Sequence, residues 1–437
     1  KFSLHSNFCP SSNAFEKTLS MLLRVPYFDE AWELMGEIRK QHPSLLTLKS
    51  MSIMLQRIAK FQSHEAALRA FIKMEKDIFV GKKFGTSEFN VLLLAFCTQR
   101  WMVEAHSLFK KLHPQFHPNA TTMNILLLGF KGTGDFAAME MFYHNALRRG
   151  FRPNNITYTI RINACCRKGF LNDGLRLFHE MQRANCLPTL ATYTALIHGA
   201  GVAQNASMAW ELFRKIGDNN LQPDTGAYNT LILSLIKAND VRSALKLVDE
   251  MENKNIRLDD LTYQTMFLGL MALDSIDGVE NLYWKMVGHN FMPSAKTVQM
   301  LMKIFCQNYR LDLGLDLWEY LMKQGYCPHR YVLDLLVVGL CARGKGKRAL
   351  ECSVQMLERG MPVSEGTFRV LERFLLKAGK TYLLRMLDDK IKRVRCTLPP
   401  SRGLAVGLSS STLVDDYRRA GFIAGPRHNP RPPKTFR

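Results

Sequence analysis

The sequence has no Cys-x-x-Cys pair among its ten cysteines and no long apolar run. Most cysteines, such as Cys97 and Cys306, lie at apolar positions of predicted helices, so we expect reduced thiols that serve as small hydrophobic groups. The best apolar run, Leu335–Ala342, lies between Asp334 and Arg343 and is too short to cross a membrane. The sequence therefore predicts neither a disulfide framework nor a membrane-spanning segment.

Motifs for catalysis and for cofactors are equally scarce. Gly344–Lys347 is similar to a phosphate-binding loop, but it lacks the preceding glycine spacing and a strand. His113 and His117 have metal-like spacing, but no Cys or carboxylate cluster joins them. No His-x-Glu with Cys-x-x-Cys of a zinc deaminase follows Pro399. We therefore expect no catalytic residue, no metal, no cofactor and no small-molecule substrate.

Acidic residues are in deficit. Lys and Arg number 59 against 38 Asp and Glu, which gives a formal net charge of +21. Such a surplus favours a polyanionic partner, nucleic acid above all. The alternative is a positive charge that serves solubility alone.

What the chain has in abundance is a repeated pair of short helices. Within residues 155–189, Tyr158 lies on a first predicted helix, Gly169 ends it, Phe178 lies on a second helix, and Pro188 stops the unit. Equivalent residues recur 35 positions later at Tyr193, Phe213 and Pro223. Because one such pair cannot bury its apolar face alone, the period predicts a stacked array.

We therefore expect an all-α fold, a right-handed α-solenoid of about eleven helix-turn-helix units, each 34–35 residues long, with an extended basic C-terminal tail. The tail, Ser401–Arg437, carries seven Lys or Arg against two Asp and has no apolar period. The predicted parts are an irregular segment, 1–11; degenerate capping units, 12–85; a repeat array, 86–364; a degenerate capping unit, 365–399; and the tail, 400–437.

Three motifs recur within the units. First helices open as in Tyr228–Ile232, YNTLI; second helices follow an Ala-Leu-x-Leu-Phe-x-x-Met pattern; and units end as in Gly150–Asn154, GFRPN. Over about Ser12–Pro399 these motifs resemble the pentatricopeptide repeat family, in its form built of plain 35-residue units. The tetratricopeptide repeat has a similar length, but its Trp and Gly-Tyr pattern is missing from the first helices.

The resemblance implies single-stranded RNA binding, with one base per unit read by the unit's fifth and last residues. Carried over, the predicted base-reading pairs are Asn90 with Asn119, Asn124 with Asn154, Thr159 with Thr189, Thr194 with Asp224, and Asn229 with Asp259. The family associates Asn/Asn with a pyrimidine, Thr/Asp with G and Asn/Asp with U, while Thr/Thr has no clear assignment. Since the family runs N to C along RNA 5′ to 3′, the expected core is Y-Y-N-G-U.

Later units depart from the family's pattern. Gln264/Ser294, Gln299/His329 and Asp334/Ser364 match no good code, which puts base reading by the C-terminal half in doubt. An apolar second residue, which sandwiches bases in the family, is present as Ile156 and Leu261. The alternative for all the Asn and Thr positions is a role as helix N-caps, which these residue types also favour.

The resemblance also places phosphate-contacting cations at the end of each first helix. The residues at that place are Arg24, Lys60, Arg167, Lys237 and Lys377. The alternative for each is a merely solvated charge.

The function predicted from the sequence is non-catalytic RNA binding in organellar gene expression, mitochondrial or alternatively plastid. The partner is single-stranded RNA or rRNA, with ribosomal proteins if the chain is a ribosome-associated or ribosomal component. Alternatives are a free factor for processing, stability or translation of one transcript, and a tetratricopeptide-like protein scaffold without RNA. The chain begins at Lys1, which we interpret as a processed or trimmed N-terminus.

Overall fold

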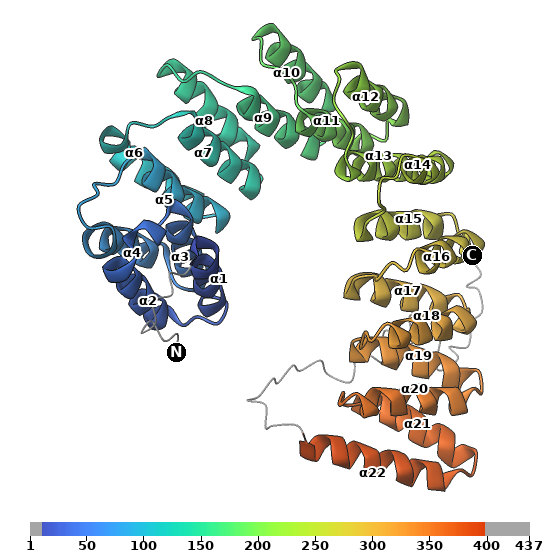
Figure 1. Ribbon diagram of the computed structural model, residues 1–437. Helices are drawn as coiled ribbons and strands as arrows, with labels where there is room; N and C mark the ends of the chain where they lie inside the picture. The colour runs from blue at the N-terminus through green and yellow to red at the C-terminus, as the bar shows by residue number, and fades with distance from the viewer. Residues whose placement is uncertain (1–10, 398–437) are drawn as a thin grey trace, which may run out of the picture. The chain divides into compact units, whose positions relative to one another are not determined.

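The computed structural model describes residues 11–397, and in that range the regular structure is helical (Figure 1). The predicted all-α repeat fold is confirmed. The C-terminal tail lies outside the described residues. The first helices of the units are α1 (Ser12–Leu22), α3 (Leu48–Phe61), α5 (Thr86–Thr98), α7 (Ala120–Thr133), α9 (Asn155–Arg167), α11 (Leu190–Val202), α13 (Thr225–Lys237), α15 (Asp260–Ala272), α17 (Ala295–Gln307), α19 (Arg330–Ala342) and α21 (Glu365–Lys377).

Each first helix is followed by a second helix of similar length. These are α2 (Phe28–Gln41), α4 (His64–Lys73), α6 (Met102–Phe116), α8 (Phe136–Arg148), α10 (Leu171–Arg183), α12 (Ala206–Asp218), α14 (Val241–Asn253), α16 (Ile276–Gly288), α18 (Leu311–Lys323), α20 (Gly346–Glu358) and α22 (Thr381–Thr397). A short 3₁₀ helix, η1 (Pro43–Leu45), and a π-helical turn, η2 (Met74–Ile78), belong to the two irregular N-terminal units.

Backbone geometry repeats more regularly than the side chains do. From α8 onward the residues that end second helices in the left-handed region are spaced 35 apart: Gly150, Asn185, Asn220, Asn255, Asn290, Gly325 and Gly360. From α7 onward those that end first helices are also spaced 35 apart: Gly134, Gly169, Gln204, Asn239, Asp274, Tyr309, Gly344 and Gly379. Glycine and asparagine adopt this conformation at low cost, which explains most of these positions. Gln204 and Tyr309 adopt it at a cost of about 1–2 kcal/mol.

The chain forms two compact units, residues 1–240 with α1–α13 and residues 241–437 with α14–α22. Within each, first helices pack side by side in one layer, and second helices pack on first helices of the same compact unit, as α10 packs on α9 and α11. In the first unit that layer is α1, α3, α5, α7, α9, α11 and α13; in the second it is α15, α17, α19 and α21.

The core lies between these helices and takes in the tyrosines near the start of the first helices. Tyr158, Tyr193 and Tyr228 are each at most 4% exposed, so they pack rather than present rings for base stacking. The hydroxyl of Tyr158 donates to Glu180 at 3.2 Å, and that of Tyr193 accepts from the Asn219 amide at 2.9 Å. These contacts fasten a first helix to the end of its partner.

First helices approach one another closely where α11 carries glycine. A Cβ on Gly199 would lie 2.6 Å from the Cys166 sulfur of α9. A Cβ on Gly201 would lie 2.7 Å from the Ser234 Cα of α13. The second contact involves backbone, so the neighbouring helix must move if a side chain is added.

We expect Gly201→Ala to destabilise the protein by about 1–3 kcal/mol, because the added methyl overpacks the contact between α11 and α13. The control is Gly217→Ala in α12, where a Cβ meets nothing within 4 Å. There the better helix propensity of alanine should stabilise by up to about 1 kcal/mol. Urea-unfolding midpoints of the two variants should move in opposite directions; a shift of Gly201→Ala equal to that of Gly217→Ala would contradict the packing account.

Candidate nucleic-acid interface

In most regular units the side chain of the last residue caps the first helix of the next unit; Thr189 is an exception, because its side chain accepts no cap hydrogen bond. Asn154 Oδ1 accepts from the Thr157 N–H at 3.0 Å, and Asp224 Oδ1 accepts from the Ala227 N–H at 2.8 Å. Asn119 and Asp259 make the equivalent bond. The cap role is therefore real. At Asn154 and Asp224 the cap uses one side-chain oxygen, Oδ1.

The fifth residue of a unit faces this cap. Asn124 Nδ2 donates to Asn154 Oδ1 at 3.3 Å, and the Asn90 and Asn119 amides lie 3.5 Å apart. The structure thus brings the residues of these two predicted base-reading pairs together.

The other predicted pairs differ in how they are connected. Thr159 reaches Thr189 through the Thr192 hydroxyl, with oxygens 2.8 and 3.2 Å apart. Thr194 instead donates to the Leu190 carbonyl of its own helix at 2.8 Å, and Asp224 caps α13. Asn229, in the first compact unit, is buried on α13, and Asp259, in the second, caps α15.

A cavity of about 330 Å³ lies beside the Thr159/Thr189 pair. Its wall includes Ile156, which is 53% exposed, together with Lys131 and Asn163. The Asn163 Oδ1 is buried and has no hydrogen-bond partner among the described residues. An exposed apolar side chain beside polar groups is an arrangement that can hold a base face and read its edge.

The predicted phosphate-contacting cations are exposed in the structure. Arg167, Lys237 and Lys377 are the last residues of α9, α13 and α21, and Lys60 is the penultimate residue of α3. Arg24 differs from the expectation, because α1 ends at Leu22 and Arg24 lies in the turn beyond it. Within residues 11–397 these five cations form no ion pair.

Charge is segregated between first and second helices over α7–α13 of the first compact unit. Helices α7, α9, α11 and α13 contain no Asp or Glu. Carboxylates lie on the second helices, where they pair with neighbouring cations, as in Lys215–Glu211 and Arg176–Asp173. One first-helix cation is internally neutralised: Arg161 is buried and pairs with Glu140 of α8. The remaining first-helix charge is therefore positive and unpaired.

The electrostatic effect of this segregation is visible in individual groups. Burial lowers the pKa of Lys131, and the positive charge of Arg167 lowers it further. Burial also lowers the pKa of His198, as do the charges of Lys237 and Arg167. These side chains come from α7, α9, α11 and α13, so the cations of successive first helices are close enough to repel one another. An anion placed among them would relieve that repulsion.

Sequence reasoning missed Lys131, Asn163 and His198. Asn163 and His198 are the ninth residues of their units, four positions after Thr159 and Thr194. Residues four apart lie on the same helix face. The four-residue spacing could therefore have predicted that Asn163 and His198 lie beside Thr159 and Thr194.

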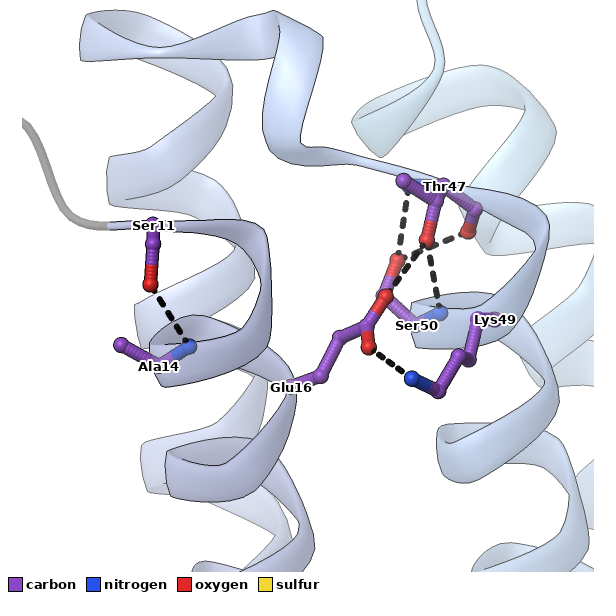
Figure 2. A network of polar contacts seen from close by, with 6 residues as sticks. All are labelled: Ser11, Ala14, Glu16, Thr47, Lys49 and Ser50. Atoms are coloured by element: carbon purple, nitrogen blue, oxygen red, sulfur yellow. Dashed lines mark hydrogen bonds and ion pairs between the residues drawn. The ribbon is translucent and has the colours of Figure 1, made fainter.

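The first, degenerate unit has an equivalent junction that is closed (Figure 2). Its fifth residue is Glu16, 7% exposed, which accepts from the hydroxyl of Thr47, the unit's last residue, at 3.2 Å. Lys49 makes an ion pair with the other Glu16 oxygen at 2.5 Å. Thr47 also caps α3 together with Ser50. Because the carboxylate is already paired inside the protein, this junction offers no base-reading group.

Four other features considered from the sequence are a metal site, a phosphate-binding loop, a membrane span and the cysteines. The described residues contain no group of three or more His, Cys, Asp or Glu placed to hold a metal ion. Gly344 and Lys345 form the turn before α20, and Gly346 packs against the Phe374 ring, as an inter-helix turn requires. Within the described range no helix is long and apolar enough to cross a bilayer. The described cysteines, Cys97 and Cys306 among them, are free thiols, and burial raises the pKa of both to about 12.

The fold and the junctions define a class: an α-helical repeat protein whose first helices present polar pairs and unpaired cations on one layer. Models of the PPR repeat family match residues 118–167, 157–202 and 223–272, and models of the PPR repeat match residues 89–113 and 191–221. The pentatricopeptide repeat-containing protein At3g61360 of Arabidopsis thaliana is 50% identical over 403 residues, which is 92% of this chain and 81% of that protein. The chain belongs to the pentatricopeptide repeat family.

Two further comparisons are more distant. A second Arabidopsis thaliana protein, the pentatricopeptide repeat-containing protein At3g22670, mitochondrial, is 36% identical over 28% of this chain and 21% of its own length. The crystal structure of the pentatricopeptide repeat protein PPR10 in complex with an 18-nt psaJ RNA element has a TM-score of 0.54 at 17% identity and covers 90% of this chain. This chain spans 57% of that protein's length, and the likeness shows the same fold.

We expect Arg167→Gln to raise the pKa of His198, because the substitution removes one of the two cations that disfavour the imidazolium. The control is Arg176→Gln on α10, where the cation lies on the other layer and pairs with Asp173. The measurement is an NMR titration of the His198 ring. An unchanged His198 pKa in Arg167→Gln would show that the two first helices are not electrostatically coupled.

Proposed function

We propose that the chain is a single-stranded RNA-binding solenoid, without catalysis of its own, that acts in organellar gene expression. The observation that carries the proposal is the run of first helices α7, α9, α11 and α13, which hold polar junction pairs and cations and contain no Asp or Glu within the helices themselves. RNA supplies what this layer lacks: phosphates for the cations and base edges for the polar pairs.

Base reading is proposed for the pairs of the first compact unit rather than for the later ones. In the second unit the Gln264 amide donates to Thr297 at 2.9 Å and to Asp260. Asp334 accepts from the hydroxyls of Ser364 and Thr367. Gln264 thus uses both of its Nε2 hydrogens inside the protein, so presenting them to a base would break an internal hydrogen bond, whereas Asn124 uses one Nδ2 hydrogen on Asn154. Asp334 is 7% exposed and accepts both hydroxyls on Oδ1. The later units would then bind RNA backbone or protein.

A mitochondrial location is part of the proposal, with the plastid as the alternative. It is supported by the name of the second Arabidopsis relative, which is labelled mitochondrial. Within that setting the chain acts either as a ribosome-associated or ribosomal component that contacts rRNA and proteins, or as a free factor for one transcript. The internally hydrogen-bonded polar groups of the second compact unit favour the ribosomal role. The proposed base-reading pairs of the first compact unit favour the role of a factor for one transcript. Sedimentation of the native complex with ribosomal subunits, before and after RNase, separates the two.

The protein-scaffold alternative predicts a different charge and polarity of the groove. A tetratricopeptide-like scaffold without RNA predicts an acidic or apolar groove and a complex insensitive to RNase. Helices α7, α9, α11 and α13 carry no acidic residue, which favours RNA over a basic protein partner.

We expect the full chain to bind single-stranded RNA with an affinity that falls steeply as salt rises, because phosphate neutralisation releases counterions. Lys237→Gln should lower the slope of log K against log salt by about 0.7, the value for one phosphate contact on a single strand. The matched control is Lys215→Gln on α12, which removes the same charge from an ion pair with Glu211 and should leave the slope unchanged. Salt-independent affinity of the wild-type protein would overturn the proposed function.

We expect Asp224→Asn to shift the preferred base at the fourth position of the Y-Y-N-G-U core from G toward A. A carboxylate only accepts hydrogen bonds, which suits the donor-rich edge of G, whereas an amide also donates. The discrimination should change by about 1–3 kcal/mol. The fold should hold, because asparagine caps a helix as well as aspartate does.

The check is the affinity for four RNAs that differ only at that base. Asp218→Asn, which removes a carboxylate from the end of α12, is the matched charge control. If wild type and Asp224→Asn give the same flat profile, this pair does not read sequence, and the ribosomal-scaffold form of the proposal gains support.

A further inference from the structure

The third residue of several units contacts the fifth residue of the unit before it. These third residues are threonines that are at most 1% exposed. The contacts are Thr157 with Asn124 at 2.8 Å, Thr192 with Thr159 at 2.8 Å, Thr297 with Gln264 at 2.9 Å, and Thr367 with Asp334. In each case a buried threonine hydroxyl therefore contacts the fifth residue of the preceding unit. That residue is a predicted base reader, or occupies the same position in its unit.

At Asn124 the hydrogen-bond network allows only one amide orientation. Asn154 Oδ1 is fixed as an acceptor by the Thr157 N–H at 3.0 Å, so the Asn124 atom that faces it must be the donor Nδ2. Asn124 Oδ1 then points to the Thr157 hydroxyl, whose single hydrogen lies between Asn124 Oδ1 at 2.8 Å and Asn154 Oδ1 at 3.0 Å. Turning the amide over would place two acceptor oxygens against each other.

The locked orientation determines what the pair can offer to a base. One Nδ2 hydrogen of Asn124 is used by Asn154, and the other is directed away from that bond. Asn154 uses its oxygen as the cap and keeps its own amide nitrogen. The pair therefore offers donors alone, which suits the carbonyl oxygens of a pyrimidine.

Resting on the proposed RNA binding, we infer that Thr157 is a positioning residue for base recognition. Its hydroxyl holds the Asn124 amide so that this pair presents donors and selects a base by its acceptor atoms. Without the hydroxyl, Asn124 Oδ1, on a side chain that is 5% exposed, would be buried without a partner. The amide would then have to turn or move, and the distinction between donor and acceptor would be lost.

Two other junctions of the same compact unit lack this lock. At the first Asn/Asn pair, the Thr122 hydroxyl donates to Asn119 at 3.1 Å, and Asn90 Oδ1 has no partner among the described residues. At the Thr194/Asp224 junction the third residue is Ala227, which has no hydroxyl. Thr122 and Thr157 both complete a capping box with the preceding asparagine. They share the structural role, and Thr157 alone of the two contacts the fifth residue.

The test measures the affinity of the full chain for short single-stranded RNAs that carry the U-X-A-G-U core, with X as each of the four bases. Wild type should prefer a pyrimidine at X. Thr157→Val, which keeps the shape and removes the hydroxyl, should reduce the pyrimidine-to-purine ratio by about tenfold. Thr157→Ser, which restores a hydroxyl, should keep the wild-type ratio.

The matched control is Thr122→Val, measured on RNAs that vary the first base of the core. It removes the same hydroxyl from an equivalent capping box, so any loss of helix capping appears in both variants, and its base ratio should not change. An unchanged ratio in Thr157→Val, or a uniform loss of affinity for all four RNAs, would overturn the inference. So would a wild type that binds RNA without preference at X, which leaves the proposed function standing. A wild type that binds none of these RNAs at any salt concentration overturns the proposed function itself.

Discussion

The helix N-cap at the end of each unit is the interaction on which the rest of the structure depends. One side chain, such as Asn154 or Asp224, ends a loop and satisfies an N–H of the next first helix that would otherwise lack a partner. The same side chain lies beside the fifth residue of its own unit, as Asn154 lies beside Asn124. Folding of each first helix therefore places a polar pair at the junction before any ligand arrives.

The sequence predicted the helix pairs well because their physical cause is periodic and local. The apolar spacing around Tyr158 and the stop at Pro188 repeat every 35 residues, and the first helices begin at the residues where those units begin. Less was predictable where a non-glycine residue adopts the left-handed conformation. Gln204 and Tyr309 end first helices as Gly169 does, because the packing of neighbouring helices imposes the turn on whatever residue is present.

The positions of the polar pairs and of the end-of-helix cations could be predicted by counting residues within each repeat unit. Their partners could not be predicted, because partners depend on contacts between units. The ion pair of Lys49 with Glu16 joins two units and closes a junction that position alone would count as open. The mutual effect of Arg167 and His198 likewise arises between helices of successive units. Arg24 shows the opposite failure, since the first unit's helix ends before the expected place.

Each proposed base-reading site is built from two successive repeats. The fifth residue and the cap come from one unit, and the third residue that touches them comes from the next, as with Asn124, Asn154 and Thr157. The cations reach across units as well, because Arg167 of α9 acts on Lys131 of α7 and on His198 of α11. The surroundings of a proposed reader pair therefore depend on the next repeat, and two units with the same fifth and last residues differ in their hydrogen bonds. Asn90 and Asn124 are such a case: both pair with asparagine, but only Asn124 has its oxygen held by the following threonine.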